Sequence, residues 1–315
     1  MPSIQFLKVN ILILLLASGC GQSSRMQSGN GYIDVEGGKI WYSVSGEGTK
    51  TPILLLHGGP GYPSYYLRPL NKLGSERPVI MFDQLGCGRS DRIEDTTLMT
   101  IDHFVDQVQK VTDHLKLTEF YLYGHSWGSM LATDFYLKHP EKVKGLILAS
   151  PCLDAKRWVK DADALIDTLP DSISSVLKAS IKGIPQESTM LKQAVQNYLE
   201  NFYLRRKPIP ADVDSSDAQM GTNVYVYMWG ENEFFATGTL KEYDRTNLLN
   251  KITVPTLYLT GEFDEAQPAT VKYYQSITPN SRFEMIPNAG HLTMQDNSAD
   301  DLAAIKSFLN DPSHN

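Results

Sequence analysis

Ser126 is the first candidate for chemistry because it stands at the centre of a Gly-x-Ser-x-Gly pentapeptide, residues 124–128. The apolar residues 120–123 before it predict a strand, and residues 130–137 after it form an amphipathic segment that predicts a helix. In such a strand–turn–helix context the motif forms a sharp turn that exposes the serine hydroxyl. Glycine on both sides permits the close backbone approach that this turn needs. We therefore predict that Ser126 is a nucleophile.

A serine hydroxyl needs a base to remove its proton and an acid to orient that base. His291 and His314 are the last two of the seven histidines, and His314 lies in the terminal tail. His291 directly follows the last predicted strand, and Asp264 follows the strand before it. The alternative for Asp264 is a turn or helix-capping role before Pro268. The chain order of serine, acid and histidine nevertheless predicts the catalytic triad Ser126, Asp264 and His291.

The oxyanion that forms during acyl transfer requires two backbone N–H donors. One is expected from Trp127, the residue after the nucleophile. The other is expected from Gly59 in a glycine-rich loop after an apolar strand, because Pro60 has no N–H to donate. We expect structural roles for His57 in that loop and for His125 beside the nucleophile.

The elements that must position these residues alternate between short apolar runs and helical patterns. Mostly apolar runs stand at residues 53–56, 79–82, 120–123, 146–149, 256–260 and 283–286. Residues 101–115 show a helical period with Thr100 as the expected N-cap, and a last amphipathic helix covers residues 302–309. Residues 32–36 and 39–45 flank a Gly-Gly pair and predict a hairpin. This alternation indicates a mostly parallel sheet buried on both faces, as in the α/β-hydrolase fold.

One long segment interrupts this alternation. Residues 151–250 contain helical patterns and an aromatic cluster at residues 224–229. Open α/β sheets bind ligands at the carboxyl ends of their strands, and an insertion at this point of the chain would cover those ends. We predict a helical cap at residues 151–250 and an α/β-hydrolase core formed by residues 30–150 and 251–311.

The N-terminal residues predict export. Residues 1–19 combine the positive charge of Lys8, an apolar stretch at residues 11–17 and small residues before Cys20, which is typical of a secretory signal. The LASGC sequence also resembles a bacterial lipoprotein box, in which the cysteine is lipidated. The polar residues 20–29 then form a tether. We expect anchoring to a bacterial membrane by a lipid on Cys20, facing the periplasm or the cell surface; the alternative is a plain secretion signal.

The composition of the chain limits the classes of binding partner that are expected. The 315 residues are 42% hydrophobic and 21% charged, and the net charge of −7 without a basic patch argues against nucleic acid binding. No His/Cys/Asp cluster has the spacing of metal ligands, so neither a metal nor a cofactor is implied. Cys87 and Cys152 follow strands that two others should separate, which is too far for a disulfide. The oligomeric state stays open.

Five motifs together resemble the proline iminopeptidase family, whose members are α/β-hydrolase aminopeptidases. They are HGGPG at residues 57–61, DQLGCGRS at 83–90, GHSWG at 124–128, WGENEF at 229–234 and GEFDE at 261–265. The likeness extends over residues 30–310. It implies cleavage of substrates that carry a free N-terminal amino group.

The resemblance also assigns two glutamates. In that family, a cap glutamate and a glutamate beside the catalytic aspartate bind the α-ammonium of the substrate, and these roles fall on Glu233 and Glu265. A cationic amine in a partly dry pocket does need carboxylates near it, and Glu231 and Glu262 are two further candidates. Leu85 departs from the family pattern, in which Arg is common, and this departure leaves the substrate open.

We interpret the chain as a serine hydrolase that releases an N-terminal proline or another small residue from short peptides or amides. An amino-acid amidase and a lactone or ester hydrolase on the same scaffold are the alternatives. A non-catalytic, peptide-binding lipoprotein is a further alternative, which the complete triad and intact elbow glycines disfavour.

Overall fold

The structure is a computed structural model that describes residues 26–314. The predicted signal at residues 1–19, Cys20 and most of the tether therefore lie outside the described residues. Within the described part of the chain, no helix is long and apolar enough to cross a membrane.

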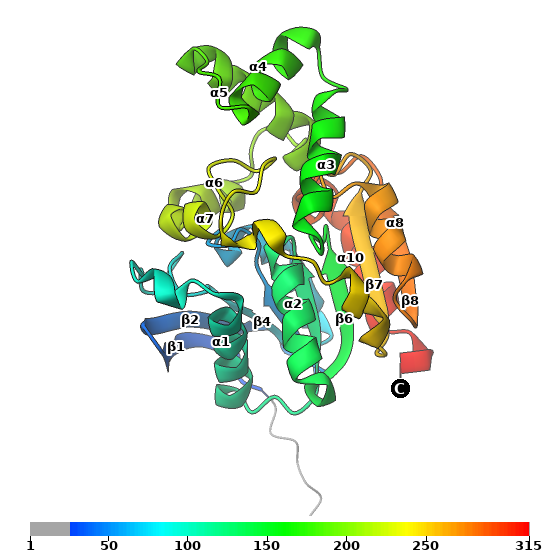
Figure 1. Cartoon of the computed structure of the whole chain (residues 1–315). Coiled ribbons are helices and arrows are strands. Elements are labelled where there is room, and N and C mark those ends of the chain that lie inside the picture. The colour runs from blue at the N-terminus through cyan, green and yellow to red at the C-terminus, as the bar shows by residue number, and fades with distance from the viewer. Residues whose placement is uncertain (1–25, 315) are drawn as a thin grey trace, which may run out of the picture.

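Within residues 26–314, an eight-stranded sheet forms the centre of the molecule, in the order β1-β2-β4-β3-β5-β6-β7-β8 (Figure 1). The strands are β1 (Gly29–Val35), β2 (Gly38–Ser45), β3 (Ile53–Leu56), β4 (Val79–Phe82), β5 (Phe120–His125), β6 (Val143–Ala149), β7 (Thr256–Gly261) and β8 (Ser281–Ile286). β2 pairs antiparallel with both β1 and β4, and all other neighbouring strands are parallel. The predicted hairpin and mostly parallel sheet are confirmed.

Helices cover both faces of the sheet. α1 (Ile101–His114), α2 (Trp127–Lys138) and α8 (Pro268–Ser276) contribute to the apolar core on one face. The 3-10 helix η1 (Ser64–Ser75), α9 (Thr293–Asp296) and α10 (Ser298–Leu309) contribute to the core on the other face. Short 3-10 helices are η2 (Thr96–Leu98), η3 (Pro140–Lys142) and η7 (Pro312–His314). Because both faces are covered, β3, β4 and β5 are buried at every residue.

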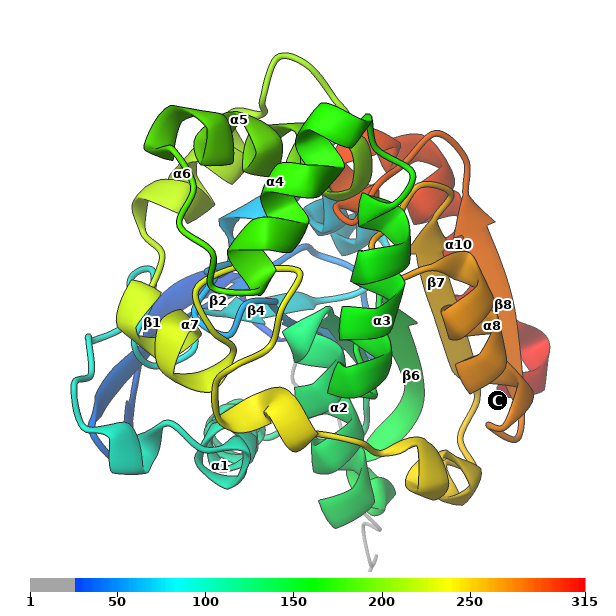
Figure 2. The same ribbon diagram turned by 45° about the horizontal axis from the view of Figure 1, so that its top comes forward.

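The segment between β6 and β7 is helical. It contains α3 (Ala155–Ile166), α4 (Asp171–Ile181), α5 (Ser188–Tyr198), the π-helix η4 (Leu199–Tyr203), α6 (Ala211–Ala218), α7 (Thr222–Met228), η5 (Thr239–Glu242) and η6 (Thr246–Lys251). α3, α4 and α5 share a small apolar core of their own, and α4 and α5 lie farthest from the sheet (Figures 1 and 2). α6 and α7 lie lower, near the strand ends (Figure 1). We call this segment the cap.

The helix after Ser126 differs from its prediction. The sequence predicted an amphipathic helix over residues 130–137, whereas α2 begins at Trp127 and nine of its twelve residues are buried. α2 is enclosed because it packs on β5 and β6 while α1 covers part of its outer side. A helix between a sheet and other helices has no polar face, so the amphipathic assignment was wrong.

Cys87 and Cys152 are both buried and free. Cys87 follows β4 and Cys152 follows β6, and the sheet order puts β3 and β5 between them. The predicted separation by two strands is confirmed.

Asp301 in α10 is a fully buried carboxyl group with incomplete hydrogen bonding. Thr293 Oγ1 donates to its Oδ1 at 2.7 Å, while Oδ2 has no partner within residues 26–314. Burial raises the pKa of Asp301 to about 7. The folded state therefore binds a proton that the unfolded state releases above pH ~4, so stability falls as pH rises from ~4 to ~7 and stays low above that.

We expect Asp301→Asn to stabilise the protein at pH 8, because Asn keeps an acceptor for Thr293 and cannot ionise. The gain in free energy of unfolding should be on the order of 3 kcal/mol at pH 8 and smaller at pH 5. Thermal unfolding at both pH values measures it, with the exposed Asp300→Asn as control. A gain of equal size at both pH values would contradict the ionisation of Asp301 as its cause.

Candidate active site

Ser126 occupies a sharp turn between β5 and α2. Its φ of +54° and ψ of −121° are a strained conformation for a non-glycine residue, and its N–H donates to Ala149 O at 3.0 Å. A Cβ on Gly124 would lie 2.2 Å from Gly128 O, and one on Gly128 would lie 2.3 Å from Leu56 O. Both flanking glycines are therefore required by close backbone contacts, as expected for a nucleophile elbow.

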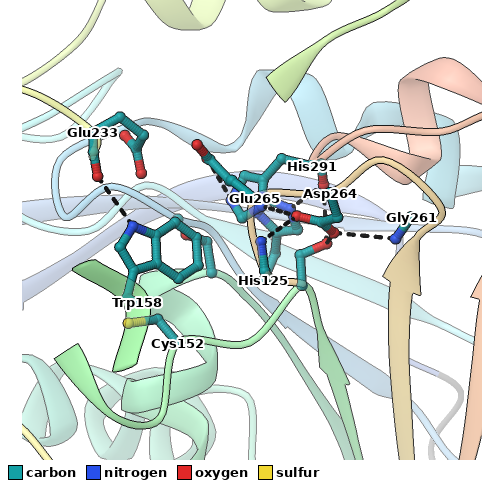
Figure 3. Close-up of polar contacts among 12 residues, drawn as sticks. His125, Cys152, Trp158, Glu233, Gly261, Asp264, Glu265 and His291 are labelled. Atoms are coloured by element: carbon teal, nitrogen blue, oxygen red, sulfur yellow. Dashed lines mark hydrogen bonds and ion pairs between the residues drawn. The ribbon is translucent and has the colours of Figure 1, made fainter. Parts of the chain in front are cut away.

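His291 and Asp264 are hydrogen-bonded to each other at the carboxyl edge of the sheet (Figure 3). His291 Nδ1 lies 2.8 Å from Asp264 Oδ1, and both side chains are buried. Asp264 also accepts hydrogen bonds from the N–H groups of Gly261 and Ala266 and from the hydroxyls of Ser150 and Thr260. Burial alone would raise the pKa of Asp264, but His291 and these donors outweigh it and hold the pKa below its usual value. The carboxylate is thus kept ionised and can orient the histidine.

Ser150 supports both members of this pair and was missed by the sequence analysis. It follows β6 with a φ of +46°, and its Oγ lies 2.6 Å from Asp264 Oδ2 and 3.0 Å from His291 O. No motif in the sequence marks Ser150 as a supporting residue. Its role depends on which loops meet at the edge of the sheet, and the sequence pattern does not show this.

Ser126, His291 and Gly59 line one cavity of about 410 Å³ between the core and the cap. Trp127 is the first residue of α2, and the first N–H groups of a helix have no partner within it. Gly59 has a φ of +108°, which only glycine adopts readily. No hydrogen bond joins Ser126 Oγ to the His291 ring within residues 26–314, and such bonds are often long before substrate binds. Ser126, His291 and Gly59 therefore line one cavity, whereas Asp264 is buried behind His291, and Trp127 lines a smaller recess beside Ser126.

The cap holds the loop that carries His291. His291 N donates to Phe202 O at 2.9 Å, and Leu292 N donates to Tyr203 O at 3.0 Å. The Tyr203 ring stacks on the His291 ring with centroids 5.6 Å apart. The π-helix η4 thus connects the cap directly to the candidate base.

His57 holds the glycine loop, as expected. Gln84 N donates to His57 Nε2 at 2.9 Å, so the ring proton is on Nδ1 and donates to Gly58 O at 2.9 Å. Trp127 Nε1 donates to Gln84 Oε1 at 2.8 Å. The glycine loop, the β4 loop and the elbow helix are therefore joined by hydrogen bonds.

A second chain of hydrogen bonds runs from the glycine loop through Tyr66 and His125 to His291. Gly58 N donates to Tyr66 Oη at 2.7 Å, so the Tyr66 hydroxyl donates to His125 Nδ1 at 2.8 Å. Burial, followed by repulsion from His291, lowers the pKa of His125 to about 3, so this ring is neutral. Its remaining proton is on Nε2 and donates to His291 O at 3.0 Å. The sequence suggested a structural role for His125 but gave no sign of Tyr66.

We expect Tyr66→Phe to lower kcat about tenfold with little change in KM. The substitution leaves the Gly58 N–H without an acceptor and no longer fixes which ring nitrogen of His125 carries the proton. Losing such a hydrogen bond costs about 1–3 kcal/mol. The loss should be equal for amide and ester substrates, since the chain positions His291 and does not contact the leaving group. Steady-state kinetics with both substrates test this, with Tyr65→Phe as the matched control. A change in KM alone would contradict a positioning role.

Glu233 and Glu265 approach each other beside His291 (Figure 3). Glu265 is 1% exposed, and neither of its carboxylate oxygens makes a hydrogen bond of normal geometry with the described residues. The hydroxyl of Tyr198, which also lacks such a partner, is its nearby polar neighbour and acts to lower the pKa of Glu265. Its Oε1 lies 3.8 Å from His291 Nε2. Glu233 lines the cavity and accepts a hydrogen bond from Tyr225 Oη at 2.6 Å. Burial, and then repulsion from Glu233 and Asp264, raises the pKa of Glu265, and burial also raises that of Glu233.

Glu231 and Glu262, the two further candidates for binding the amine, differ in their position relative to the cavity. Glu231 is exposed and lines the cavity. Glu262 is also exposed, but it is not part of the cavity wall and accepts a hydrogen bond from Asn288 N at 2.9 Å. Within the described residues, no group of three or more His, Cys, Asp or Glu side chains could hold a metal ion.

The chain is similar to known proteins in both sequence and fold. A family model for the alpha/beta hydrolase fold matches residues 51–298. The proline iminopeptidase of Heyndrickxia coagulans is 38% identical over 282 residues, which cover 89% of this chain and 98% of that protein. The crystal structure of the proline iminopeptidase of Mycobacterium smegmatis has a TM-score of 0.84 at 28% identity and covers 91% of this chain and 98% of its own. The structure of VinJ has the same TM-score at 29% identity, covering 90% and 98%. The expected fold and the resemblance are confirmed.

Proposed function

The chain belongs to the alpha/beta hydrolase family and, within it, to the proline iminopeptidase family, and on that premise we propose that it is a serine aminopeptidase. It releases an N-terminal proline or another small residue from short peptides or amides through an acyl-enzyme. The observation that carries this proposal is the Glu265 carboxylate, which is buried without a hydrogen-bond partner among the described residues. Such a group is costly unless a ligand supplies its partner, and an α-ammonium group would do so.

The proposed reaction starts at Ser126. His291 Nε2 removes the proton from Ser126 Oγ, which attacks the carbonyl carbon, while Asp264 stabilises the imidazolium through Nδ1. The N–H groups of Gly59 and Trp127 hold the oxyanion. His291 then gives its proton to the leaving amine, and the C–N bond breaks to leave an ester on Ser126. A water molecule, deprotonated by His291, attacks this ester and releases the amino acid and the free serine.

Glu233 and Glu265 bind the α-ammonium group in this proposal. Glu265 Oε1 lies 3.8 Å from His291 Nε2, and Glu233 is close enough to raise the pKa of Glu265 by repulsion, which supports a single cation bound between the two carboxyls. Burial raises both pKa values, so the empty site holds a proton at pH values where ordinary carboxyls have lost theirs, and a bound ammonium group would replace that proton. The first residue of the substrate is thereby fixed with its carbonyl group at Ser126.

Leu85 stands where the family commonly has Arg, but this difference favours neither the amidase nor the lactone or ester alternative. Leu85 is fully buried, its N–H donates to Gln107 Oε1 at 2.9 Å, and it is not part of the cavity wall. A turnover panel separates the alternatives: prolyl and alanyl arylamides, their N-acetylated forms, amino-acid amides, an aryl ester and an acyl lactone. The aminopeptidase proposal expects the free-amine arylamides to be the best substrates and N-acetylation to remove most of their turnover. Preference for the lactone or the neutral ester would overturn it.

We also propose that the mature protein is anchored to a bacterial membrane by a lipid on Cys20, on the basis of the apolar residues 11–17 and the small residues before the cysteine. Cys20→Ala should release or mislocalise the protein without changing its activity on soluble substrates. Intact-mass analysis and membrane fractionation measure both effects. An unmodified N-terminus produced by cleavage at another residue would contradict this proposal.

A further inference from the structure

The wall of the substrate cavity carries negative charge without a cation to balance it. Asp217, Glu231 and Glu233 line the cavity, and none of the described residues that line it is a lysine or an arginine. Glu233 is assigned to the α-ammonium group by the proposed function. The other two carboxylates have no role in that proposal, and Asp217 has the more defined position.

Asp217 in α6 is connected to the reaction centre through two aromatic residues. The Tyr203 ring stacks on His291, and the edge of Tyr62 packs against Tyr203 with centroids 6.5 Å apart. The Tyr62 hydroxyl donates to Asp217 Oδ1 at 2.8 Å. Tyr62, Tyr203 and Asp217 all line the same cavity. The carboxylate of Asp217 thus stands at the far end of a continuous wall that begins at His291.

That wall lies on the side of the leaving group. His291 must protonate the leaving amine, so the departing residue extends from His291. In the proposed function the first residue is bound through its α-ammonium group by Glu233 and Glu265. A small recess beside Ser126 and Glu233 is lined by Trp158, Trp229 and Cys152, and Asp217 is not part of it. The second residue of the substrate therefore passes along Tyr203 and Tyr62 towards Asp217.

Two arginines that contact α6 or the residues just after it do not pair with Asp217. Arg68 pairs with Asp212 at 2.9 Å, and Arg92 donates to two backbone carbonyls just beyond the helix. Asp217 lines the cavity and forms no ion pair with any of the described residues, and its one side-chain hydrogen bond among them is the one from Tyr62. A positive charge on the substrate would meet an unpaired carboxylate there, whereas a negative charge would meet repulsion.

We propose that Asp217 selects the leaving residue by charge: substrates with a lysine-like cation at the second residue are favoured, and those with a carboxylate there are disfavoured. The inference rests on the proposed aminopeptidase function and extends it to the second residue. Asp217 is exposed at the cavity mouth, so the effect is that of a solvated charge pair. Preference for a cationic over a neutral second residue should be about two- to fivefold at low salt.

The test compares three dipeptide amides: prolyl-lysine amide, prolyl-(Nε-acetyl-lysine) amide and prolyl-glutamate amide. In the wild type, kcat/KM should fall in that order, and the differences should shrink in 1 M NaCl, where the Debye length is about 3 Å. Asp217→Asn should make the three values nearly equal, while Asn keeps an acceptor for Tyr62. Asp214→Asn is the matched control because it removes an exposed charge from the same helix but not from the cavity wall.

Two failures can be distinguished. Equal kcat/KM values for the lysine and acetyl-lysine substrates in the wild type, or an unchanged ratio in Asp217→Asn, would overturn the role of Asp217 and leave the aminopeptidase proposal intact. If Asp214→Asn changed the kcat/KM ratio between these substrates as much as Asp217→Asn does, the preference would come from the overall charge of the protein. That result would also overturn the role of Asp217. If the wild type cleaved none of the three amides and hydrolysed only esters, the proposed function itself would fail, and the inference with it.

Discussion

Ser126→Ala should reduce turnover of every substrate class by about 10⁵-fold or more in kcat, because the nucleophile and its base act as one unit. Only the background that comes from the oxyanion donors and substrate binding should remain. The fold should persist, since alanine occupies the same strained conformation at φ +54° and no hydrogen bond of Ser126 Oγ is lost within residues 26–314. Steady-state kinetics with a prolyl arylamide and an aryl ester, together with thermal unfolding, measure both expectations.

The matched control is Ser276→Ala, which changes an exposed serine at the end of α8 and should leave turnover unchanged. His291→Ala should reproduce the loss, because without the base Ser126 Oγ keeps its proton. Substantial activity of Ser126→Ala on any one substrate would mean that a different group carries that reaction. A loss restricted to the arylamide would likewise remove the shared serine mechanism.

The central sheet was predictable because burial on both faces makes its strands apolar throughout. The predicted run at residues 53–56 coincides with β3, and the run at residues 79–82 coincides with β4. β6 begins three residues before its predicted start, since Lys144 and Gly145 interrupt the apolar run while the backbone still pairs with β5. Pattern arguments detect the buried centre of a strand better than its ends.

The proposed catalytic residues could be named from the sequence because turns at strand ends have restricted sequences. Ser126 is marked by its two glycines, and Asp264 and His291 are marked by the strands that they follow. The residues that support them were not, because each acts across a long sequence distance: Tyr66 reaches His125 from a 3-10 helix, and Ser150 reaches Asp264 from another loop. These contacts exist only after the sheet has brought the loops together.

The sequence predicted that the cap is an insertion between two strands, but it did not predict how the cap helices are arranged. Its helices are short, and the absence of a strand pattern gave no indication of how they pack. The sequence therefore could not predict that the carbonyls of Phe202 and Tyr203 would hold the loop of His291, or that Asp217 would line the cavity. Contacts between the cap and the core depend on how the cap helices pack, and the sequence pattern does not encode that packing.

Glu233→Gln and Glu265→Gln should each lower kcat/KM for a prolyl arylamide by about 30-fold or more. Removing one partner of a buried charge pair costs about 2–5 kcal/mol, and about 1.4 kcal/mol corresponds to a factor of ten. Glu265 is the sharper case because neither of its carboxylate oxygens has a hydrogen-bond partner within the described residues, so its replacement breaks no hydrogen bond of the free enzyme. A neutral aryl ester should be hydrolysed at nearly the wild-type rate by both variants.

Two controls separate charge recognition from damage to the site. Glu262→Gln changes an exposed glutamate outside the cavity wall and should leave both substrates unaffected. N-acetylation of the arylamide removes the substrate cation and should reproduce the glutamate variants in the wild-type enzyme. If both glutamate variants slowed ester and amide equally, the glutamates would have a structural role, and the ester or lactone alternative would gain support.

The pH dependence supplies an independent test of the same pair. Burial raises the pKa values of Glu233 and Glu265, so the empty site is protonated over a range in which ordinary carboxyls are not. An ammonium group binds well only to the ionised pair, and kcat/KM for a prolyl arylamide should therefore rise as pH increases through the apparent pKa of the pair. The neutral ester should lack this rise, and either Gln substitution should shift it. A pH profile that is the same for both substrates would contradict recognition of the amine by these glutamates.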